Sequence, residues 1–325
     1  MATQKDILKP TPDRLLLLPV QDHEAWAFYK DAVAAFWTAE EIDVAHDDFG
    51  AIGGADRRAL KAVLAFFACA DGIVGENLAV NLIPQVQSAE CRAFYAFQAA
   101  IETVHQEVYG KLIEAYIRDP EEQRAMFAAV EEDPAVKLLT EWAMRWTDDE
   151  QASFAERLVA FACVEGILFS GPFCIIFYYK TRGLLPGLCK SNEFIARDEA
   201  QHMMFACFLY KDRLLPEQKA SPERVHQIVR ECVDLEKSFA RQAIEGMPGL
   251  TADTMARYVE FVADVLCVSL GVERIYKTDN PFSWMTVIGM PAKTNFFEGR
   301  VSDYKRGVSA QVKDTSVFVA DDVDF

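Results

Sequence analysis

Basic residues are scarce in this chain of 325 residues. Lys and Arg together number 33 against 50 Asp and Glu, which gives a formal net charge of −17. A nucleic-acid groove needs clustered Lys and Arg to neutralise phosphates, so the composition argues against nucleic acid as a partner. The same excess of carboxylates is compatible with binding cations.

Paired cysteines are also missing. The eight cysteines are scattered through apolar stretches, and no two of them form a Cys-x-x-Cys pair. This pattern excludes a zinc ribbon and is typical of reduced, buried thiols. Residues 1–10 are polar and lack the apolar run of a secretory signal, so we expect a cytoplasmic protein.

One apolar run, residues 158–179, is long enough to span a bilayer. Glu165 lies near its middle, where a carboxylate costs roughly 2.5–3.5 kcal/mol on insertion scales. Pro172 and two glycines interrupt the same run. A helix that is apolar on all sides is equally typical of the centre of a large soluble bundle. We therefore expect a core helix and no membrane.

Sustained period-two alternation is absent, and helical periodicity dominates, so the sequence predicts an all-α fold. Pro and Gly punctuation divides the pattern into long helices with short connections, which is typical of a bundle. The predicted helices are Glu24–Trp37, Arg57–Asn81, Ser88–Ile117, Ala135–Trp146, Gln151–Tyr179, Asn192–Lys211, Pro222–Gly246 and Ala252–Gly271.

The ends of the chain differ from this helical region. We expect an N-terminal extension over residues 1–22, a helical domain over 23–300 and a flexible C-terminal tail over 301–325. The tail is polar and ends in the acidic and apolar tip VFVADDVDF. Such a segment cannot bury enough apolar surface to order itself.

Histidine is rare, yet three of the five histidines follow a glutamate by three positions. In the first pair, Gln98, Glu102, His105 and Tyr109 fall on one stripe of an otherwise apolar helix. The segment FIARDEAQHMMFACFLY repeats this arrangement with Glu199 and His202.

The third pair, Glu223 and His226, fits an ordinary helix start. Ser221 is a typical N-cap and Pro222 a typical first helical residue, so Glu223 falls in a first turn where an acid suits the helix dipole. We interpret this pair as structural.

Two further carboxylates stand where apolar residues would be expected: Asp71 in AVLAFFACADGIV and Glu165 in AFACVEGILF. An isolated buried carboxylate costs several kcal/mol, and metal coordination removes that cost. Each residue taken alone has another explanation. Asp71 could equally be a helix cap, Glu165 could be the partner of a buried Arg, and either His could be a hydrogen-bonded core residue. Jointly, two Glu-x-x-His pairs and two more carboxylates form the ligand set of a ferritin-like di-iron bundle, whose O and N donors suit iron or manganese.

At this point the sequence resembles the class I ribonucleotide reductase small-subunit family, and most of all its eukaryotic-type branch. The resemblance runs from FWTAEEIDV at residues 36–44 to the last residue. It is carried by the segments LAFFACADGIVGENL, FYAFQAAIETVHQEVYG, FACVEGILFSGPF, LLPGLCKSNEFIARDEAQH, YVEFVADVLCVSLG and TNFFEGRVSDY.

The resemblance implies a role for individual residues. One metal ion would be held by Asp71, Glu102 and His105, and the other by Glu165, Glu199 and His202, with bridging carboxylates between them. Tyr109 would carry the radical. Gln98 lies on the stripe of Glu102, and the hydrophobic radical pocket would comprise Phe169, Phe173 and Ile195. The inner part of a radical-transfer route would comprise Trp37, Asp198 and His105, with Arg197 in the same network and Tyr304 as the outer relay.

The implied protein is the small subunit of a ribonucleoside-diphosphate reductase. Its di-iron centre, with manganese as the alternative metal, would activate dioxygen and generate a stable tyrosyl radical on Tyr109. The radical would be passed to a large catalytic subunit that reduces ribonucleotides to deoxyribonucleotides. The resemblance also implies a homodimer and a tail that docks on the large subunit through Phe318, Asp322, Asp324 and Phe325.

Three other functions share part of this pattern. A di-metal oxidase or acyl-carrier desaturase would have the ligands but no need of Trp37, Tyr304 and the acidic tail. A ferritin-like iron-storage protein would be smaller and needs no radical tyrosine. A small subunit with degenerate radical chemistry is disfavoured because all six ligands and Tyr109 are present.

Two positions depart from the family pattern. Pro172 stands where the family usually has a small polar residue, in a helix known there for distortion, and proline has no N–H to donate. The tail motif FVADDVDF has one residue more between its two phenylalanines than the usual FxxDxDF.

Overall fold

The structure, a computed structural model, describes residues 5–12 and 15–285. Residues 1–290 form one compact unit. Within the described ranges the chain is helical and contains no β-strand, which confirms the all-α prediction. The predicted tail, residues 301–325, lies outside these ranges, and the predicted domain boundaries stay predictions.

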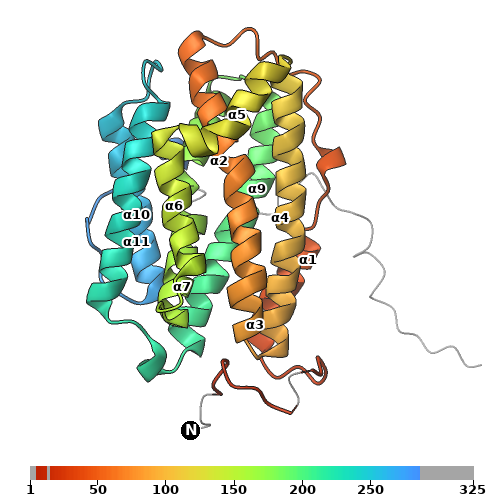
Figure 1. Ribbon diagram of the computed structural model, residues 1–325, viewed down its shortest axis with the longest axis vertical. Helices are drawn as coiled ribbons and strands as arrows, with labels where there is room; N and C mark the ends of the chain where they lie inside the picture. The colour runs from red at the N-terminus through yellow and green to blue at the C-terminus, as the bar shows by residue number, and fades with distance from the viewer. Residues whose placement is uncertain (1–4, 13–14, 286–325) are drawn as a thin grey trace, which may run out of the picture. The chain divides into compact units, whose positions relative to one another are not determined.

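Most of the described chain lies in α-helices (Figure 1). In chain order they are α1 (His23–Ala34), α2 (Gly54–Asn77), α3 (Ile83–Gln85), α4 (Ala89–Tyr116), α5 (Pro120–Glu132), α6 (Pro134–Asp148), α7 (Phe154–Cys163), α8 (Ser170–Thr181), α9 (Pro186–Phe208), α10 (Pro222–Ala243) and α11 (Ala252–Leu270). Short 3₁₀ helices are η1 (Ala39–Glu41), η5 (Pro216–Gln218) and η6 (Ser283–Met285), and π-helices are η2 (Leu78–Leu82), η3 (Val164–Leu168) and η4 (Leu209–Arg213).

Polar caps fix several of the helix starts. The hydroxyl groups of Ser88, Ser153 and Ser221 each accept a hydrogen bond from a main-chain N–H in the first turn of α4, α7 and α10. Such a cap satisfies an N–H group that has no partner inside the helix. A polar residue that begins an apolar helical pattern is visible in the sequence, and the predicted starts at Ser88 and Pro222 agree with α4 and α10, whereas the predicted start at Gln151 was three residues too early for α7.

Two of the predicted helix boundaries were wrong for the same reason. The prediction treated Asp119-Pro120 and Pro186-Gly187 as breaks, and it therefore missed α5 and began α9 at Asn192. In the structure Pro120 and Pro186 are the first residues of α5 and α9. A proline at the first helical position loses no hydrogen bond, so it begins a helix as readily as it ends one.

The predicted helix Gln151–Tyr179 was also wrong as a single helix. It is divided into α7, the π-helix η3 and α8. Glu165 lies in η3, and π segments of this kind occur frequently at functional sites. Pro172 is the third residue of α8, directly after this irregular turn. Pro172, the residue that departs from the family pattern, therefore lies next to a helix turn that is already distorted.

The long helices lie side by side around a common core (Figure 1). Helix α4 contacts α1 and α2, α9 contacts α7 and α8, and α10 packs on α11. Two helical stretches are long and apolar enough to cross a membrane, Gly54–Gln85 and Phe154–Thr181. In the second, 94% of the apolar window is buried inside the protein, against 61% in the first. The apolar run around Glu165 therefore forms part of the protein core.

Helix α9 is anchored by a residue from a distant loop. Leu185, which precedes the helix, has a left-handed backbone (φ 48°). The Asp47 carboxylate accepts hydrogen bonds from the N–H groups of Gly187 (2.7 Å) and Leu188 (2.9 Å). Its Oδ2 also accepts from the hydroxyl group of Tyr116 on α4. Asp47 therefore ties the first turn of α9 to α4.

This anchor predicts the effect of Asp47→Ala. The substitution should lower the free energy of unfolding by about 1–2 kcal/mol, the usual cost of losing a helix cap, because two main-chain N–H groups lose their acceptor. Urea denaturation of the full-length chain would measure it. Asp48→Ala is the control, since the exposed Asp48 carboxylate accepts only locally, from Ala51 N at 3.0 Å, and should cost less than about 0.5 kcal/mol. Equal losses in the two variants would contradict the anchoring role.

Candidate metal centre

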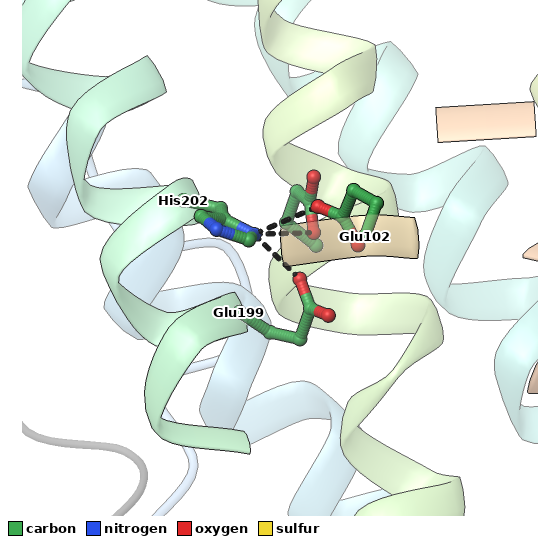
Figure 2. A group of neighbouring side chains, drawn as sticks. Glu102, Glu199 and His202 are labelled. Carbon is green, nitrogen blue, oxygen red and sulfur yellow. Dashed lines mark hydrogen bonds and ion pairs between the residues drawn. The ribbon is translucent and has the colours of Figure 1, made fainter. Parts of the chain in front are cut away.

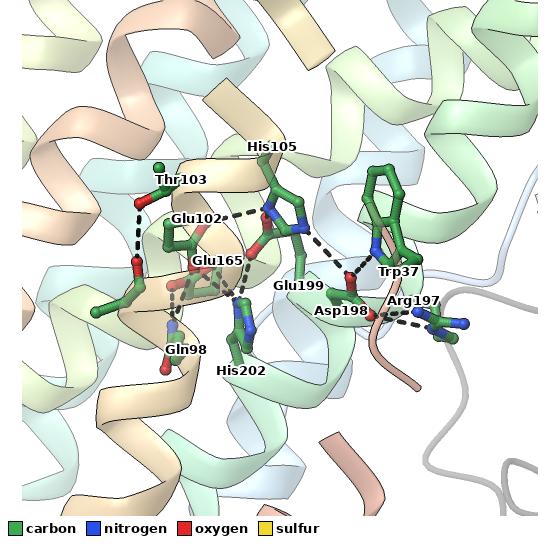
Figure 3. Close-up of polar contacts among 11 residues, drawn as sticks. Trp37, Gln98, Glu102, Thr103, His105, Glu165, Arg197, Asp198, Glu199 and His202 are labelled. Atoms are coloured by element: carbon green, nitrogen blue, oxygen red, sulfur yellow. Dashed lines mark hydrogen bonds and ion pairs between the residues drawn. The ribbon is translucent and has the colours of Figure 1, made fainter. Parts of the chain in front are cut away.

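Polar side chains from four helical segments come together in a buried cluster, and Figure 3 shows those from α4, η3 and α9. Helix α2 contributes Asp71, α4 contributes Glu102 and His105, η3 contributes Glu165, and α9 contributes Glu199 and His202. None of these six side chains is more than 3% exposed. The structure thus brings together all six of the ligands predicted from the sequence.

His202 faces three glutamates (Figure 2). Its Nδ1 lies 2.8 Å from Glu199 Oε2, 3.0 Å from Glu102 Oε1 and 3.9 Å from Glu165 Oε2. The Glu-x-x-His spacing puts Glu199 and His202 on one face of α9, so both reach the same point.

His105 lies on the other side of the same cluster. Its Nδ1 is 3.2 Å from Glu102 Oε2 and 2.9 Å from Glu199 Oε1, and its Nε2 is 3.3 Å from Asp198 Oδ2. Both Glu102 and Glu199 therefore contact the two histidines.

The potential ligand atoms fall into two groups. Oxygen and nitrogen atoms of Glu102, Glu165, Glu199 and His202 lie within 4.8 Å of one another, and so do those of Asp71, Glu102 and His105. Glu102 belongs to both groups. This division agrees with the two ligand sets that the family resemblance implied, although the identity of the ligands stays a prediction.

Two of the single-residue alternatives, those for Asp71 and Glu165, do not fit these positions. Asp71 lies inside α2 and not at its start, so it is not a helix cap. The Glu165 carboxylate accepts a hydrogen bond from Gln98 Nε2 at 2.9 Å rather than from an arginine. Gln98, which lies one turn before Glu102, is also 3.4 Å from Glu102 Oε1. It orients two carboxylates from outside the cluster.

The charges of the cluster do not balance when all four carboxylates are ionised. Neither carboxylate oxygen of Asp71 nor Oε2 of Glu165 has a hydrogen-bond partner. Burial, and then the charges of the neighbouring carboxylates, raises the pKa of Asp71 and of Glu165 well above the ordinary values. Burial alone would lower the pKa of His202, but Glu102 and Glu199 raise it to about 9. Two imidazoles do not balance four carboxylates.

Two divalent cations fit this cluster on chemical grounds. They would balance the four carboxylates and occupy the oxygens of Asp71 and Glu165 that lack partners, which would otherwise be costly to bury. Carboxylate and imidazole donors suit iron and manganese. The residues present therefore fit a di-metal site.

A second network leads away from His105 toward the surface (Figure 3). Asp198 Oδ2 accepts from Trp37 Nε1 at 2.7 Å, and its Oδ1 accepts from Arg197 Nε at 3.0 Å. Burial favours protonation of Asp198, but the hydrogen bond from His105 and the charge of Arg197 lower its pKa below the ordinary value. The rings of Trp37 and His105 are stacked with centroids 5.9 Å apart. A ligating imidazole usually donates to such a carboxylate, which fixes its orientation.

Tyr109 lies in an aromatic pocket on α4, 2% exposed. Its ring is stacked on Phe67, with centroids 4.8 Å apart and an interplanar angle of 10°. Phe67 in turn contacts Phe169 (5.5 Å) and Phe173 (5.0 Å). Burial, and then the charges of the carboxylates around it, raises the pKa of Tyr109 well above 10, so its phenol is neutral. Ile195 is buried on α9, one turn before Glu199.

Phe67 was not singled out in the sequence, although it is the side chain that stacks on Tyr109. It precedes Asp71 by four positions, so helical spacing put it on the face of α2 that carries this ligand. The same spacing excludes its neighbour Phe66, which is equally buried and packs on Phe239, but it could not show that the Phe67 ring stacks on Tyr109.

Some predicted residues are not part of this cluster. His226 lies elsewhere, with its Nε2 2.8 Å from the carbonyl oxygen of Glu273, and Ser221 caps its helix as expected. The predicted functional residues of the tail lie outside the described residues; they are Tyr304, Phe318, Asp322, Asp324 and Phe325.

The sequence of this chain is similar to those of known proteins. Residues 14–281 match the model of the family described as "Ribonucleotide reductase, small chain". The "Ribonucleoside-diphosphate reductase small chain" of Nicotiana tabacum is 48% identical over 306 residues, which cover 93% of this chain and 92% of the relative. "Ribonucleoside-diphosphate reductase subunit M2" of Homo sapiens is 44% identical over 323 residues, with coverage of 98% and 82%.

Solved structures agree with the sequence comparison. The homodimer of ribonucleotide reductase Rnr4 from Saccharomyces cerevisiae matches with a TM-score of 0.79 at 33% identity, over 85% of this chain and 88% of that one. The fold is therefore the ferritin-like helical fold that the ligand pattern predicted. The family match, the fold and the buried cluster of carboxylates and histidines agree, and the chain belongs to the ribonucleotide reductase small-chain family.

Proposed function

We propose that this chain is the radical-generating small subunit of a ribonucleoside-diphosphate reductase, which stores an oxidising equivalent on Tyr109 and passes it to a large catalytic subunit. One observation carries the proposal. A buried cluster of four carboxylates and two histidines, in which some carboxylate oxygens lack partners, lies beside a buried tyrosine whose ring stacks on Phe67. Neither an oxidase nor an iron-storage protein is favoured by the relatives.

The cluster would hold two iron ions, one near Asp71, Glu102 and His105 and the other near Glu165, Glu199 and His202. Manganese suits the same donors. When bound, the two ions would supply the oxidising power by activating dioxygen. The chain supplies placement and exclusion of water: Glu102 and Glu199 reach both histidines, and Gln98 orients Glu165.

The metal assignment predicts that Glu165→Ala and His202→Ala each lose about one metal ion per chain, because each removes a ligand from a small closed set. Metal analysis after reconstitution with Fe(II), and separately with Mn(II), would measure the deficit. His226→Ala is the matched control and should bind as the wild type does. Unchanged occupancy in both ligand variants would reject the proposed ligand set.

Tyr109 has the properties required of a radical site. Its neutral phenol would lose one electron and its proton when oxidised. The resulting phenoxyl group survives only where water and reductants are excluded. The buried rings of Phe67, Phe169 and Phe173 provide that exclusion around it.

The radical assignment predicts that Tyr109→Phe binds both metal ions but gives no stable tyrosyl signal, since only the oxidisable hydroxyl group is removed. Electron paramagnetic resonance after aerobic reconstitution would detect the signal. Tyr116→Phe, on the same helix and also buried, is the control and should keep it. A wild-type tyrosyl spectrum from Tyr109→Phe would assign the radical to another tyrosine.

The route out of the site would begin at His105. The contacts from His105 to Asp198 and from Asp198 to Trp37 form a continuous buried path, and Arg197 holds the second oxygen of Asp198. The outer relay would be Tyr304.

We further propose a cytoplasmic location and a homodimer. The exposed apolar side chains of Leu15 (77%), Leu16 (64%) and Leu18 (71%) support an interface with another chain.

The tail supplies a prediction for the large subunit as partner. Phe318 and Phe325 would be apolar anchors, while Asp322 and Asp324 would favour a basic rim. Deletion of residues 318–325 should leave the metal content and the Tyr109 radical intact but abolish nucleotide reduction in a mixture with the large subunit. A free VFVADDVDF peptide should inhibit the intact pair competitively. Full turnover by the truncated chain at limiting concentration would show that the tail is dispensable.

A further inference from the structure

One buried carboxyl group has no place in the site described so far. Glu236 on α10 is 0% exposed, and neither of its oxygens has a hydrogen-bond partner of good geometry. It forms no ion pair with any residue in the described ranges 5–12 and 15–285. A buried carboxylate without a countercharge is so costly that the group takes up a proton instead.

The surroundings of Glu236 agree with a neutral acid. Burial raises its pKa well above the ordinary value, and the main-chain N–H of Gly171, which favours the charged form, only partly offsets this rise. The titratable groups that face it are the thiols of Cys174 on α8 and Cys232 on α10, and burial raises the pKa of both. The protonated carboxyl group can therefore donate a hydrogen bond, and neither of these thiols is a charged acceptor for it.

Its position is defined by Gly171. A Cβ atom placed on Gly171 would lie only 2.0 Å from Glu236 Oε1, so this carboxyl group packs directly against the main chain of Gly171. On a helix the Cα–Cβ bond is tilted toward the preceding turn, whose carbonyl oxygens three and four residues earlier are the nearby main-chain acceptors. For residue 171 these are the carbonyl oxygens of Leu168 and Ile167.

Those two carbonyl groups differ in what they already bind. The oxygen of Ile167 accepts from Ser170 Oγ at 2.7 Å. Phe173 N donates to Phe169 O at 3.0 Å, which is the α-helical pairing of an N–H with the carbonyl oxygen four residues earlier. By the same pairing, the donor to the Leu168 oxygen would be the N–H of residue 172. Residue 172 is proline and has no N–H. The carbonyl group of Leu168, the last residue of the π-helix that carries Glu165, is therefore left without its α-helical donor.

We propose that Glu236 is a positioning residue for the metal centre: its carboxyl group donates to the Leu168 carbonyl oxygen, in place of the N–H that Pro172 lacks, and so fixes the turn that orients Glu165. The proposal rests on the proposed metal-binding function. It accounts for the absence of a side chain at Gly171 and for the tolerance of a proline in the first turn of α8, directly after the π-helix.

The test compares Glu236→Gln, which keeps a donor, with Glu236→Met, which has similar length and none. Mn(II) binding to the full-length chain, followed by titration and electron paramagnetic resonance, should be unchanged in the Gln variant. The Met variant should bind one of its two ions at least about tenfold more weakly, with an altered spectrum. Pro172→Ser, which restores an N–H, should recover binding in the Met background. Val229→Ala, equally buried on α10, is the control for destabilisation and should bind both ions normally.

A second measurement does not depend on metal. Because the folded-state pKa of Glu236 is raised, its protonated form stabilises the fold, and this contribution is lost as the pH rises above the unfolded value. The test compares the folding equilibrium constants of the metal-free wild type and of Glu236→Gln. Their ratio, wild type over variant, should fall about tenfold per pH unit from about pH 5 upward.

The outcomes separate the two proposals. Failure of the wild type itself to bind two ions would reject the metal-binding function. Wild-type Mn(II) binding by Glu236→Met, absence of rescue by Pro172→Ser, or a stability difference independent of pH would each overturn the role of Glu236 while leaving the metal centre in place.

Discussion

The fold depends on the burial of four carboxylates among apolar helices with only two imidazoles to balance them. Asp71, Glu102, Glu165 and Glu199 come from four separate helical segments, so the repulsion between them acts against the packing of α2, α4, η3 and α9. Such a centre is stable only with protons or cations in it. Binding of two divalent ions would therefore favour both the charge balance and the close approach of these helices.

The irregular features of the bundle are concentrated around this constraint. The π-helix η3 sets the direction of Glu165, and Gly171 and Pro172 follow it within one turn of α8. The aromatic side chains of Phe67, Phe169 and Phe173 then cover the side of the cluster where Tyr109 lies. The same packing that supplies the core thus also supplies the dry surroundings that a stored radical requires.

The sequence predicted which polar side chains would meet, because a buried helical stripe rarely carries polar residues without a partner, and Glu102, His105, Glu199 and His202 lie in one buried cluster as that stripe implied. It could not predict the π segment, since an inserted residue changes hydrogen bonding without changing the apolar pattern around Glu165. It misjudged Pro120 and Pro186 because a proline marks a helix start and a helix end alike. Glu236 was missed although it falls on the apolar stripe of α10, four residues after Cys232 and three before Phe239, so the helical spacing that pointed to Asp71 and Glu165 could have found it.

Anomalous diffraction at the iron absorption edge, from crystals of the protein reconstituted with Fe(II), tests the central claim most directly. We predict two peaks inside the cluster, one next to Asp71 and His105 and the other next to Glu165 and His202, with Glu102 or Glu199 between them. A single peak, or peaks located away from these side chains, would contradict the di-metal centre on which the proposed function depends.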